Sequence, residues 1–208
     1  MNIVLLGSPG SGKSFVGGRL EKSYGLAHIS TGGLLRKNTE LLKAHGIDLS
    51  DGNLVSDELV FEVLKVHMEN NPASGYVLDG IPRTLTQTGK LEEVFNVDLV
   101  LYLDVTDETV YDRLLNRLVC SKCNMLKPVS AEKDSLICTF CGGKLVRRSD
   151  DGLETIKHRI AVFRNHSEQL KQYYTRQNKL VVINANLSPE KVFEQVKNAY
   201  EAVISGDN

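Results

Sequence analysis

The chain has 208 residues, of which 41% are hydrophobic and 25% are charged, and its formal net charge is −1. This length suits one large domain, or one domain with insertions, and the composition excludes a generally disordered chain. The near-zero charge excludes a global basic field for non-specific nucleic-acid binding. No run approaches about 18 apolar residues, so we expect no membrane-spanning helix. Residues 1–7 do not begin with basic residues, so they predict a strand rather than a signal peptide. We therefore expect a cytoplasmic location.

Short apolar runs rich in β-branched residues alternate with segments of helical periodicity along most of the chain. The runs predicted as strands are residues 2–6, 27–29, 76–78, 99–103 and 180–183. The segments predicted as helices are residues 12–24, 57–70, 84–95, 106–117, 153–176 and 188–204. This alternation is typical of a doubly wound α/β domain, in which helices cover both faces of a parallel sheet.

Two segments interrupt the alternation. Residues 30–56 predict short helices, and residues 118–150 are polar and contain all four cysteines of the chain. We interpret both as insertions in one α/β core, which then comprises residues 1–29, 57–117 and 151–208.

Residues 7–14 read Gly-Ser-Pro-Gly-Ser-Gly-Lys-Ser and match the G-x-x-x-x-G-K-[ST] pattern of a phosphate-binding loop. A predicted strand precedes the loop and a predicted helix follows it, as this pattern requires. Glycines let backbone N–H groups curl around an anion, and the helix N-terminus adds partial positive charge. Lys13 supplies a cation for phosphates, and Ser14 a hydroxyl for Mg²⁺ or a phosphate oxygen. A merely glycine-rich turn is the alternative, which the agreement of all motif positions disfavours.

Asp79 ends the third predicted strand and is followed by a turn that contains Gly80 and Pro82. Ligands of a parallel sheet bind at the carboxyl ends of the strands, so we expect Asp79 beside the phosphate loop. A carboxylate there can support Mg²⁺ through water, although a helix N-cap or turn aspartate is the alternative. Arg83 follows the turn, and its guanidinium can form bidentate hydrogen bonds with phosphate oxygens.

Basic residues fall repeatedly at the ends of predicted elements. Arg113 and Arg117 are four residues apart, so we expect both on one face of the helix predicted over residues 106–117, where they repel unless an anion neutralises them. A solvated basic face is the alternative. The full set of such cations is Lys13, Arg36, Arg83, Arg113, Arg117, Arg148 and Arg159. In a nearly neutral chain this set predicts a local pocket for a small, highly charged ligand.

The four cysteines form two C-x-x-C pairs, Cys120 with Cys123 and Cys138 with Cys141, separated by fourteen residues. Two such pairs are typical of a tetrahedral Zn²⁺ site. The insertion has few large apolar residues, so a metal would stabilise it in place of a core. Because four thiolates leave no open position, we expect a structural metal. Redox motifs and disulfides are the alternatives, and the cytosol disfavours the second.

The phosphate loop, the segment Asp79-Gly80-Ile81-Pro82-Arg83-Thr84 and the cysteine insertion, in this order, resemble the adenylate kinase family, specifically its long bacterial form with a zinc-bearing lid. The other segments that extend the resemblance along essentially the whole chain are residues 29–32, 35–36, 54–58, 87, 112–113, 117, 148–151 and 159. The chain departs from the family pattern at Ser14 and Phe15, which follow the loop lysine, at Gly33, where an aspartate is common, and at Ile81, which replaces an aromatic residue.

The resemblance implies a P-loop nucleoside monophosphate kinase fold with a five-stranded parallel sheet, and the reversible, Mg²⁺-dependent reaction ATP + AMP ⇌ 2 ADP. It implies that residues 30–56 are an AMP-binding insertion and residues 118–150 a zinc-binding lid, both mobile. The implied ATP-binding residues are Gly10, Ser11, Gly12, Lys13, Ser14, Phe15, Arg113 and Arg117. The implied AMP-binding residues are Thr31, Arg36, Leu54, Val55, Gly80, Arg83, Gln87, Arg148 and Arg159.

The resemblance also assigns finer roles. Gln87 would read the adenine edge of AMP, Ser14 and Asp79 would support Mg²⁺, and the backbone of residues 184–188 would lie near the ATP adenine. The implied catalytic residues are Lys13, Arg83, Arg113, Arg117, Arg148 and Arg159.

Two other functions stay open at this point. One is another nucleoside monophosphate kinase, or a GTP:AMP phosphotransferase. The other is a P-loop ATPase or switch whose cysteine insertion binds nucleic acid or protein, which the absence of interleaved aromatic and basic residues around the cysteines disfavours. The expected partners are ATP, AMP and ADP, without nucleic acid or membrane, and the expected state is a monomer.

Overall fold

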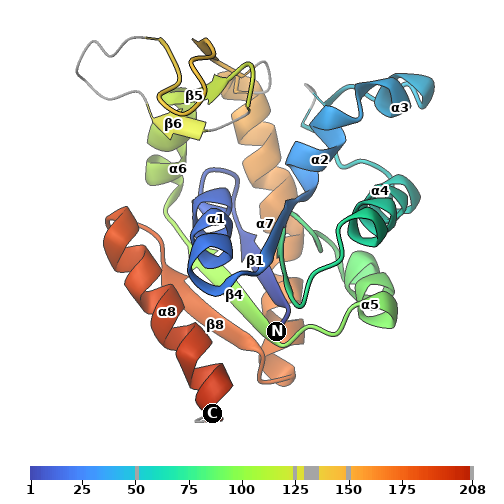
Figure 1. Cartoon of the computed structure of the whole chain (residues 1–208), viewed down its shortest axis with the longest axis vertical. Helices are drawn as coiled ribbons and strands as arrows, with labels where there is room; N and C mark the ends of the chain where they lie inside the picture. The colour runs from blue at the N-terminus through green and yellow to red at the C-terminus, as the bar shows by residue number, and fades with distance from the viewer. Residues whose placement is uncertain (50–51, 124–125, 129–135, 149–150, 207–208) are drawn as a thin grey trace.

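The computed structural model describes residues 1–49, 52–123, 126–128, 136–148 and 151–206 (Figure 1). Its central sheet contains five strands: β1 (Ile3–Gly7), β2 (Ala27–Ser30), β3 (Tyr76–Asp79), β4 (Leu99–Asp104) and β8 (Leu180–Asn184). The strand order is β2-β3-β1-β4-β8, and all neighbouring strands are parallel. The prediction of a doubly wound α/β domain with a five-stranded parallel sheet is therefore confirmed.

The helices lie where the sequence periodicity predicts them, apart from one boundary described below. They are α1 (Lys13–Tyr24), α2 (Thr31–Lys37), α3 (Thr39–Ala44), α4 (Asp57–Asn70), α5 (Leu85–Val94), α6 (Asp107–Leu115), α7 (Leu153–Arg176) and α8 (Pro189–Ser205). Several begin at a side-chain cap: the hydroxyls of Ser56, Thr84, Thr106 and Ser188 each accept a backbone N–H from the first helical turn. Such caps satisfy donors that a helix start otherwise leaves unpaired.

The core has two halves, one on each face of the sheet, because side chains alternate along a strand. In β1, Ile3 and Leu5 pack with the buried faces of α1 and α8. Val4 and Leu6 point to the opposite face and pack with residues of α4, α5 and α7. Both halves are closed by helices, as a parallel sheet requires.

This order places the phosphate loop near the middle of the sheet. The strand β1 lies between β3 and β4, and the loop leaves its carboxyl end. In the strand register, Leu5 pairs with Asp79 and Gly7 with Leu103, so Asp79 ends β3 close to the start of the loop.

The cysteine segment forms a small sheet of its own at the upper end of the view in Figure 1. Its strands are β5 (Arg117–Cys120), β6 (Leu126–Pro128) and β7 (Leu145–Val146), paired antiparallel in the order β6-β5-β7. Its small cluster of buried residues consists of Leu118, Cys120, Cys138 and Leu145. This cluster is separate from the two halves of the main core.

The prediction that Arg113 and Arg117 share one helix face is wrong. The helix α6 ends at Leu115, with Asn116 as its C-cap, and Arg117 is the first residue of β5. Pairing of Arg117 and Leu118 with β6 pulls the chain out of helical geometry at this point. The prediction used local spacing alone, whereas the boundary depends on this strand pairing.

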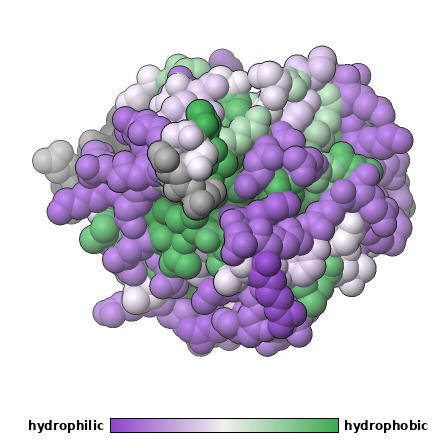
Figure 2. Space-filling view, turned by 90° about the horizontal axis from the view of Figure 1, so that it is seen from below, coloured by the Kyte–Doolittle hydropathy of each residue, from purple (hydrophilic) through white to green (hydrophobic). Residues whose placement is uncertain are grey.

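Figure 2 shows the lower end of the molecule, where hydrophilic residues surround a smaller hydrophobic area. Among the described residues, no helix has the length and apolar character needed to cross a membrane.

Candidate functional site

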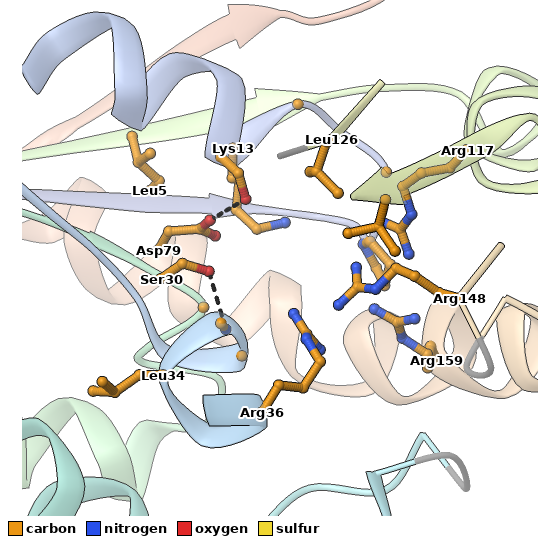
Figure 3. A pocket seen from close by; sticks show the side chains of 18 of the residues that line it. Leu5, Lys13, Ser30, Leu34, Arg36, Asp79, Arg117, Leu126, Arg148 and Arg159 are labelled. Atoms are coloured by element: carbon orange, nitrogen blue, oxygen red, sulfur yellow. Dashed lines mark hydrogen bonds between the residues drawn. The ribbon is translucent and has the colours of Figure 1, made fainter. Parts of the chain in front are cut away.

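A cleft of about 880 Å³ lies between the phosphate loop, α2, the start of α7 and the small sheet. All seven cations singled out in the sequence line it: Lys13, Arg36, Arg83, Arg113, Arg117, Arg148 and Arg159. They come from segments spread over nearly 150 residues, so the fold brings them together as the sequence analysis expects. Figure 3 shows the guanidinium groups of Arg36, Arg117, Arg148 and Arg159 converging on one part of the cavity.

The phosphate loop has the open backbone that anion binding requires. Gly10 and Gly12 have φ values of +79° and +98°, which favour glycine, and a Cβ on Gly10 would meet Leu114 at 2.9 Å. The Lys13 ammonium donates to the carbonyl oxygens of Gly7 and Ser8, at 2.7 and 2.8 Å. Burial in the cleft lowers the pKa of Lys13 to about 8, against an opposing effect from Asp79. Lys13 is therefore a cation held ready beside the loop.

Asp79 and Ser14 contact each other at the base of the cleft. The Ser14 hydroxyl donates to Asp79 Oδ2 at 2.6 Å, and His28 Nε2 lies 3.7 Å from the same oxygen. Burial acts to raise the pKa of the Asp79 carboxyl, but His28, Lys13 and Ser14 outweigh it and hold that pKa below its usual range. An ionised carboxylate beside a hydroxyl and a phosphate loop is a donor set that suits water-coordinated Mg²⁺.

A smaller pocket adjoins the cleft on the side of α2 and α4. Residues named for the acceptor nucleotide line it: Thr31, Arg36, Leu54, Val55, Gly80, Arg83 and Gln87. Arg159 also lines it, so it is continuous with the cationic cleft. The Thr31 hydroxyl is buried and has no hydrogen-bond partner among the described residues. Since a buried hydroxyl without a partner is costly, the pocket is suited to a polar ligand.

On the other side of the cleft, Arg113 connects α6 to the chain that follows β8. Its guanidinium donates to the Ala185 carbonyl at 2.8 Å. Phe15, in the first turn of α1, also lines the cleft and is 42% exposed. Ser11 is buried in the loop itself. Arg113 and Phe15 thus border the cleft, and neither of them lines the smaller pocket.

Asp151 lies among the arginines of the cleft. Arg117 donates to both of its carboxylate oxygens, with Nε at 2.8 Å from Oδ2, and Arg159 Nη1 lies 3.6 Å from Oδ1. The Asp151 side chain is only 5% exposed. The two residues that precede Asp151, Ser149 and Asp150, lie outside the described residues.

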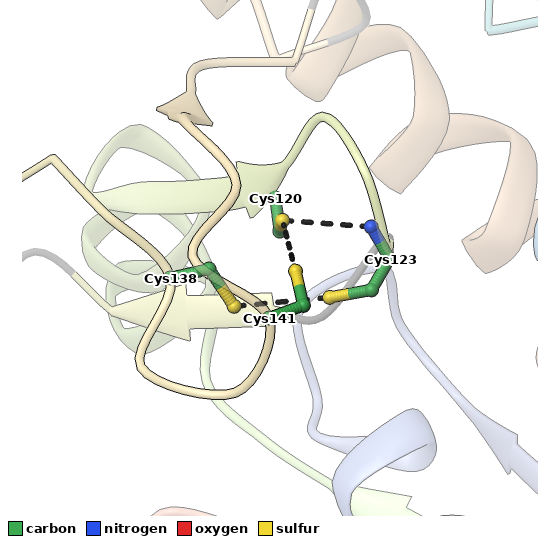
Figure 4. Close-up of side chains that lie close together, drawn as sticks. All are labelled: Cys120, Cys123, Cys138 and Cys141. Atoms are coloured by element: carbon green, nitrogen blue, oxygen red, sulfur yellow. Dashed lines mark hydrogen bonds between the residues drawn. The ribbon is translucent and has the colours of Figure 1, made fainter.

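The four cysteine sulfurs gather between β5 and the turn after Cys138 (Figure 4). They all lie within 4.8 Å of one another, with Sγ–Sγ distances of 3.4 Å for Cys120–Cys141 and 3.7 Å for Cys123–Cys138. A tetrahedral site with Zn–S bonds of about 2.3 Å needs sulfurs about 3.8 Å apart. A disulfide needs about 2.05 Å, so the geometry fits a metal rather than disulfides.

The surroundings of the sulfurs agree with this fit. Backbone N–H groups of Cys123 and Lys122 donate to Cys120 Sγ and lower the pKa of that thiol to about 6. A Cβ on Gly143 would meet Cys120 Sγ at 2.8 Å, so glycine keeps room beside the sulfurs. The cluster therefore presents thiolate ligands with space for an ion.

Three side chains of the site received no role in the sequence analysis: His28, Asp57 and Asp151. Asp57 accepts from Gln87 Nε2 at 2.7 Å across 30 residues of sequence. Asp151 lies inside the segment of residues 148–151 that carries the resemblance, which was the available signal for it. His28 and Asp57 contact partners on other elements, Asp79 and Gln87, and no local spacing indicates such contacts.

Comparison with known proteins gives consistent results. The family profile described as "Adenylate kinase" matches residues 5–179. The chain is similar to an adenylate kinase of Treponema denticola, with 38% identity over 205 residues that span 95% of this chain and 98% of the relative. It is also similar to adenylate kinases of Malacoplasma penetrans, with 40% identity over 89% of each chain, and of Methanosarcina barkeri, with 36% identity over 95% of this chain and 97% of the relative.

Proposed function

The chain belongs to the adenylate kinase family, and on that premise we propose how its side chains divide the reaction ATP + AMP ⇌ 2 ADP between the two parts of one cleft. The observation that carries the proposal is the arrangement of seven cations and a phosphate loop around one cavity with a smaller polar pocket beside it. The donor nucleotide occupies the cleft, and the acceptor nucleotide occupies the smaller pocket.

The donor site consists of the phosphate loop and the side chains across from it. Backbone N–H groups of Gly10, Ser11 and Gly12 bind the ATP phosphates at the N-terminus of α1. The residues that complete the donor site are Lys13, Ser14, Phe15, Arg113 and Arg117. The hydrogen bond from Arg113 to Ala185 supports placing the ATP adenine near residues 184–188.

The acceptor site consists of the smaller pocket. Thr31, Leu54, Val55 and Gly80 form its walls, and the free bonding capacity of the Thr31 hydroxyl supports a polar ligand there. The Gln87 amide reads the adenine of AMP. The cations that bind its phosphate are Arg36, Arg83, Arg148 and Arg159.

The transfer step depends on alignment and charge. During transfer the phosphoryl group is loosely bonded and anionic, so cations on all sides stabilise it. The reaction therefore requires alignment of the reactants and no strong general base. Lys13, Arg83, Arg113, Arg117, Arg148 and Arg159 supply that charge. Water must be excluded, or the bound ATP would be hydrolysed instead. Closure of residues 30–56 and 118–150 over the core of residues 1–29, 57–117 and 151–208 would exclude it.

Magnesium enters with ATP in this family. The hydroxyl of Ser14 and the carboxylate of Asp79 are the groups that would support it, directly or through water, and their mutual hydrogen bond keeps them together. The ion, when bound, neutralises phosphate charge and orients the β- and γ-phosphates.

A structural Zn²⁺ ion is the best match for Cys120, Cys123, Cys138 and Cys141. Their four sulfurs fill a tetrahedral shell, so no position is left for a substrate. The ion would stabilise the small sheet β6-β5-β7, whose buried apolar side chains are few.

The partners of the chain are then ATP, AMP and ADP. The near-zero net charge supports the absence of a nucleic-acid or membrane partner. We also propose a monomer in the cytosol, where the cysteines would remain reduced and available to a metal.

A coupled ADP-production assay with a panel of nucleotides tests the division of the cleft. Gln87→Ala should raise the KM for AMP much more than the KM for ATP. Arg113→Ala should do the reverse, because Arg113 lies on the donor side. Equal effects of both variants on both substrates would contradict the proposal, and hydrolysis of ATP without an acceptor by the wild type would indicate an ATPase.

A further inference from the structure

The side-chain amide of Gln87 is bound on both of its ends. Gln87 lies in the first turn of α5, is 2% exposed and lines the smaller pocket. Its Oε1 accepts from the backbone N–H of Arg83 at 2.7 Å, and its Nε2 donates to Asp57 Oδ1 at 2.7 Å. These bonds use one lone pair of the oxygen and one N–H of the nitrogen, and they leave one of each.

The chemistry of the two partners permits only one orientation of this amide. A backbone N–H can only donate, so the atom facing Arg83 must be the oxygen. A carboxylate can only accept, so the atom facing Asp57 must be the nitrogen. Turning the amide over would set N–H against N–H and oxygen against carboxylate, and would leave buried groups unpaired.

We propose that Asp57 is a specificity-determining positioning residue, which holds the Gln87 amide in the orientation that accepts a 6-aminopurine and rejects a 6-oxopurine. The proposal rests on the role of Gln87 as the reader of the AMP base. Adenine presents a donor, the 6-amino group, next to an acceptor, N1. A 6-oxopurine presents the opposite order, an oxygen next to N1–H.

An unrestrained glutamine amide would serve both bases equally, because a half-turn exchanges its donor and acceptor. The amide of Gln87 cannot make that turn at low cost while Asp57 accepts from it. The wrong base would set donor against donor and acceptor against acceptor at this amide. A polar site binds such a base much more weakly, and this difference is the source of the selectivity.

Asp57 lies at a capped helix start whose neighbours are buried. It is the first residue of α4, directly after the cap Ser56, whose hydroxyl accepts from the Leu59 N–H at 3.4 Å. Leu59 and Val60 are buried in the core and fix the first turn of this helix. The next carboxylate, Glu58, is exposed and pairs instead with Lys90 at 3.1 Å.

The test compares AMP with inosine monophosphate as phosphoryl acceptors. Inosine monophosphate carries the 6-oxo and N1–H groups without other changes to the purine ring. In Asp57→Asn, the asparagine amide can donate as well as accept, so a turned-over glutamine amide opposes a like group only at the Arg83 N–H, and the turn costs less than in the wild type. We expect the ratio of kcat/KM for AMP to that for inosine monophosphate to fall at least about tenfold, chiefly through KM.

Glu58→Gln is the matched control. It removes a carboxylate from the same helical turn without touching Gln87, so it reproduces any effect on the start of α4. Its selectivity ratio should equal that of the wild type. A fall in melting temperature of Asp57→Asn with an unchanged selectivity ratio would show a structural role only and would overturn the inference.

Gln87→Ala and the double variant separate this inference from the proposed function. If Asp57 acts through Gln87, then Asp57→Asn should not change the ratio further in the Gln87→Ala background. If Gln87→Ala alters the ratio and Asp57→Asn does not, the inference fails while the acceptor site stands. If Gln87→Ala changes neither the KM for AMP nor the ratio, the role of Gln87 in the proposed function fails, and the inference with it.

Discussion

Arg117 and Asp151 form a two-pronged ion pair at the point where the chain enters and leaves the small sheet. The guanidinium donates to both carboxylate oxygens, and both side chains are largely buried. The same carboxylate lies 3.6 Å from Arg159, so one acid neutralises two cations of the cleft. A phosphate that binds these arginines must share or replace the contacts of Asp151.

Asp151→Asn should therefore destabilise the protein. The asparagine cannot accept both donors of Arg117, and a buried guanidinium is left partly unpaired. We expect the free energy of unfolding to fall by about 1.5–3 kcal/mol, measured by urea denaturation. Glu154→Gln, which breaks the exposed pair with Lys157, is the control and should cost much less. Equal, small losses in the two variants would show that the buried pair contributes no more than a surface pair.

Lys13→Ala should abolish most activity without unfolding the chain. Lys13 is the cation held beside the phosphate loop, and in the proposed mechanism its charge stabilises the phosphoryl group most strongly in the transition state. We expect kcat to fall at least about 10²-fold, with circular dichroism unchanged. Turnover close to that of the wild type would remove Lys13 from the catalytic machinery.

The pKa of Lys13 leads to a pH-dependent binding of ATP. In the free protein this pKa is about 8, so half of the Lys13 side chains have lost the proton at that pH. Phosphates beside it favour the charged form and raise the pKa. At a pH between the pKa of Lys13 in the free protein and its pKa in the ATP complex, the complex holds more protons than the free protein. Binding therefore takes up a proton, and the affinity for ATP falls as the pH rises through this range.

Calorimetry of ATP binding at pH 8.5 in buffers of different ionisation enthalpy measures this uptake. Lys13→Met should abolish the uptake assigned to Lys13, and an uptake that persists in that variant would assign the proton to another group.

Two adjacent glycines of α1 should respond oppositely to alanine. A Cβ on Gly17 would lie 2.4 Å from the His28 ring, whereas a Cβ on Gly18 meets nothing within 4 Å. Gly17→Ala should therefore cost about 1–3 kcal/mol, because the imidazole beside Asp79 must move. Gly18→Ala should stabilise the helix by about 0.5–1 kcal/mol.

Denaturant unfolding of both glycine variants gives the comparison. Adding His28→Ala should remove most of the cost of Gly17→Ala. If the double variant is no more stable than the sum of the single effects predicts, crowding of the ring is not the cause.

Removal of the metal should loosen the small sheet and leave chemistry possible. The purified protein should contain one Zn²⁺ ion per chain, and Cys138→Ser should lower the melting temperature. Part of the activity should survive at low temperature, since the four sulfurs leave no position for a substrate. Loss of activity with unchanged melting would instead identify a catalytic metal.

Local patterns predicted those parts of the molecule that depend on local chemistry. The loop of residues 7–14, the helix predicted over residues 188–204 and the strand predicted over residues 2–6 all follow from residue types at fixed spacing. The end of α6 did not, because Asn116 and Arg117 are compatible with a helix until β6 pairs with β5. Local patterns could not predict the hydrogen bond between Asp57 and Gln87 either. Both residue types are ordinary at a helix start, and the two side chains meet only in the folded chain.

The strand order also constrains how the chain can fold during synthesis. The strand β1 is made first, yet its partners β3 and β4 begin only at Tyr76 and Leu99, and the sheet is complete only with β8 at residues 180–184. The apolar strand β1 therefore lacks one of its two partners until half of the chain, through Asp104, has been synthesised. Sheets with such distant pairings fold slowly and expose apolar edges meanwhile. A ribosome-stalled chain that ends before Leu99 should consequently depend on chaperones far more than the released protein.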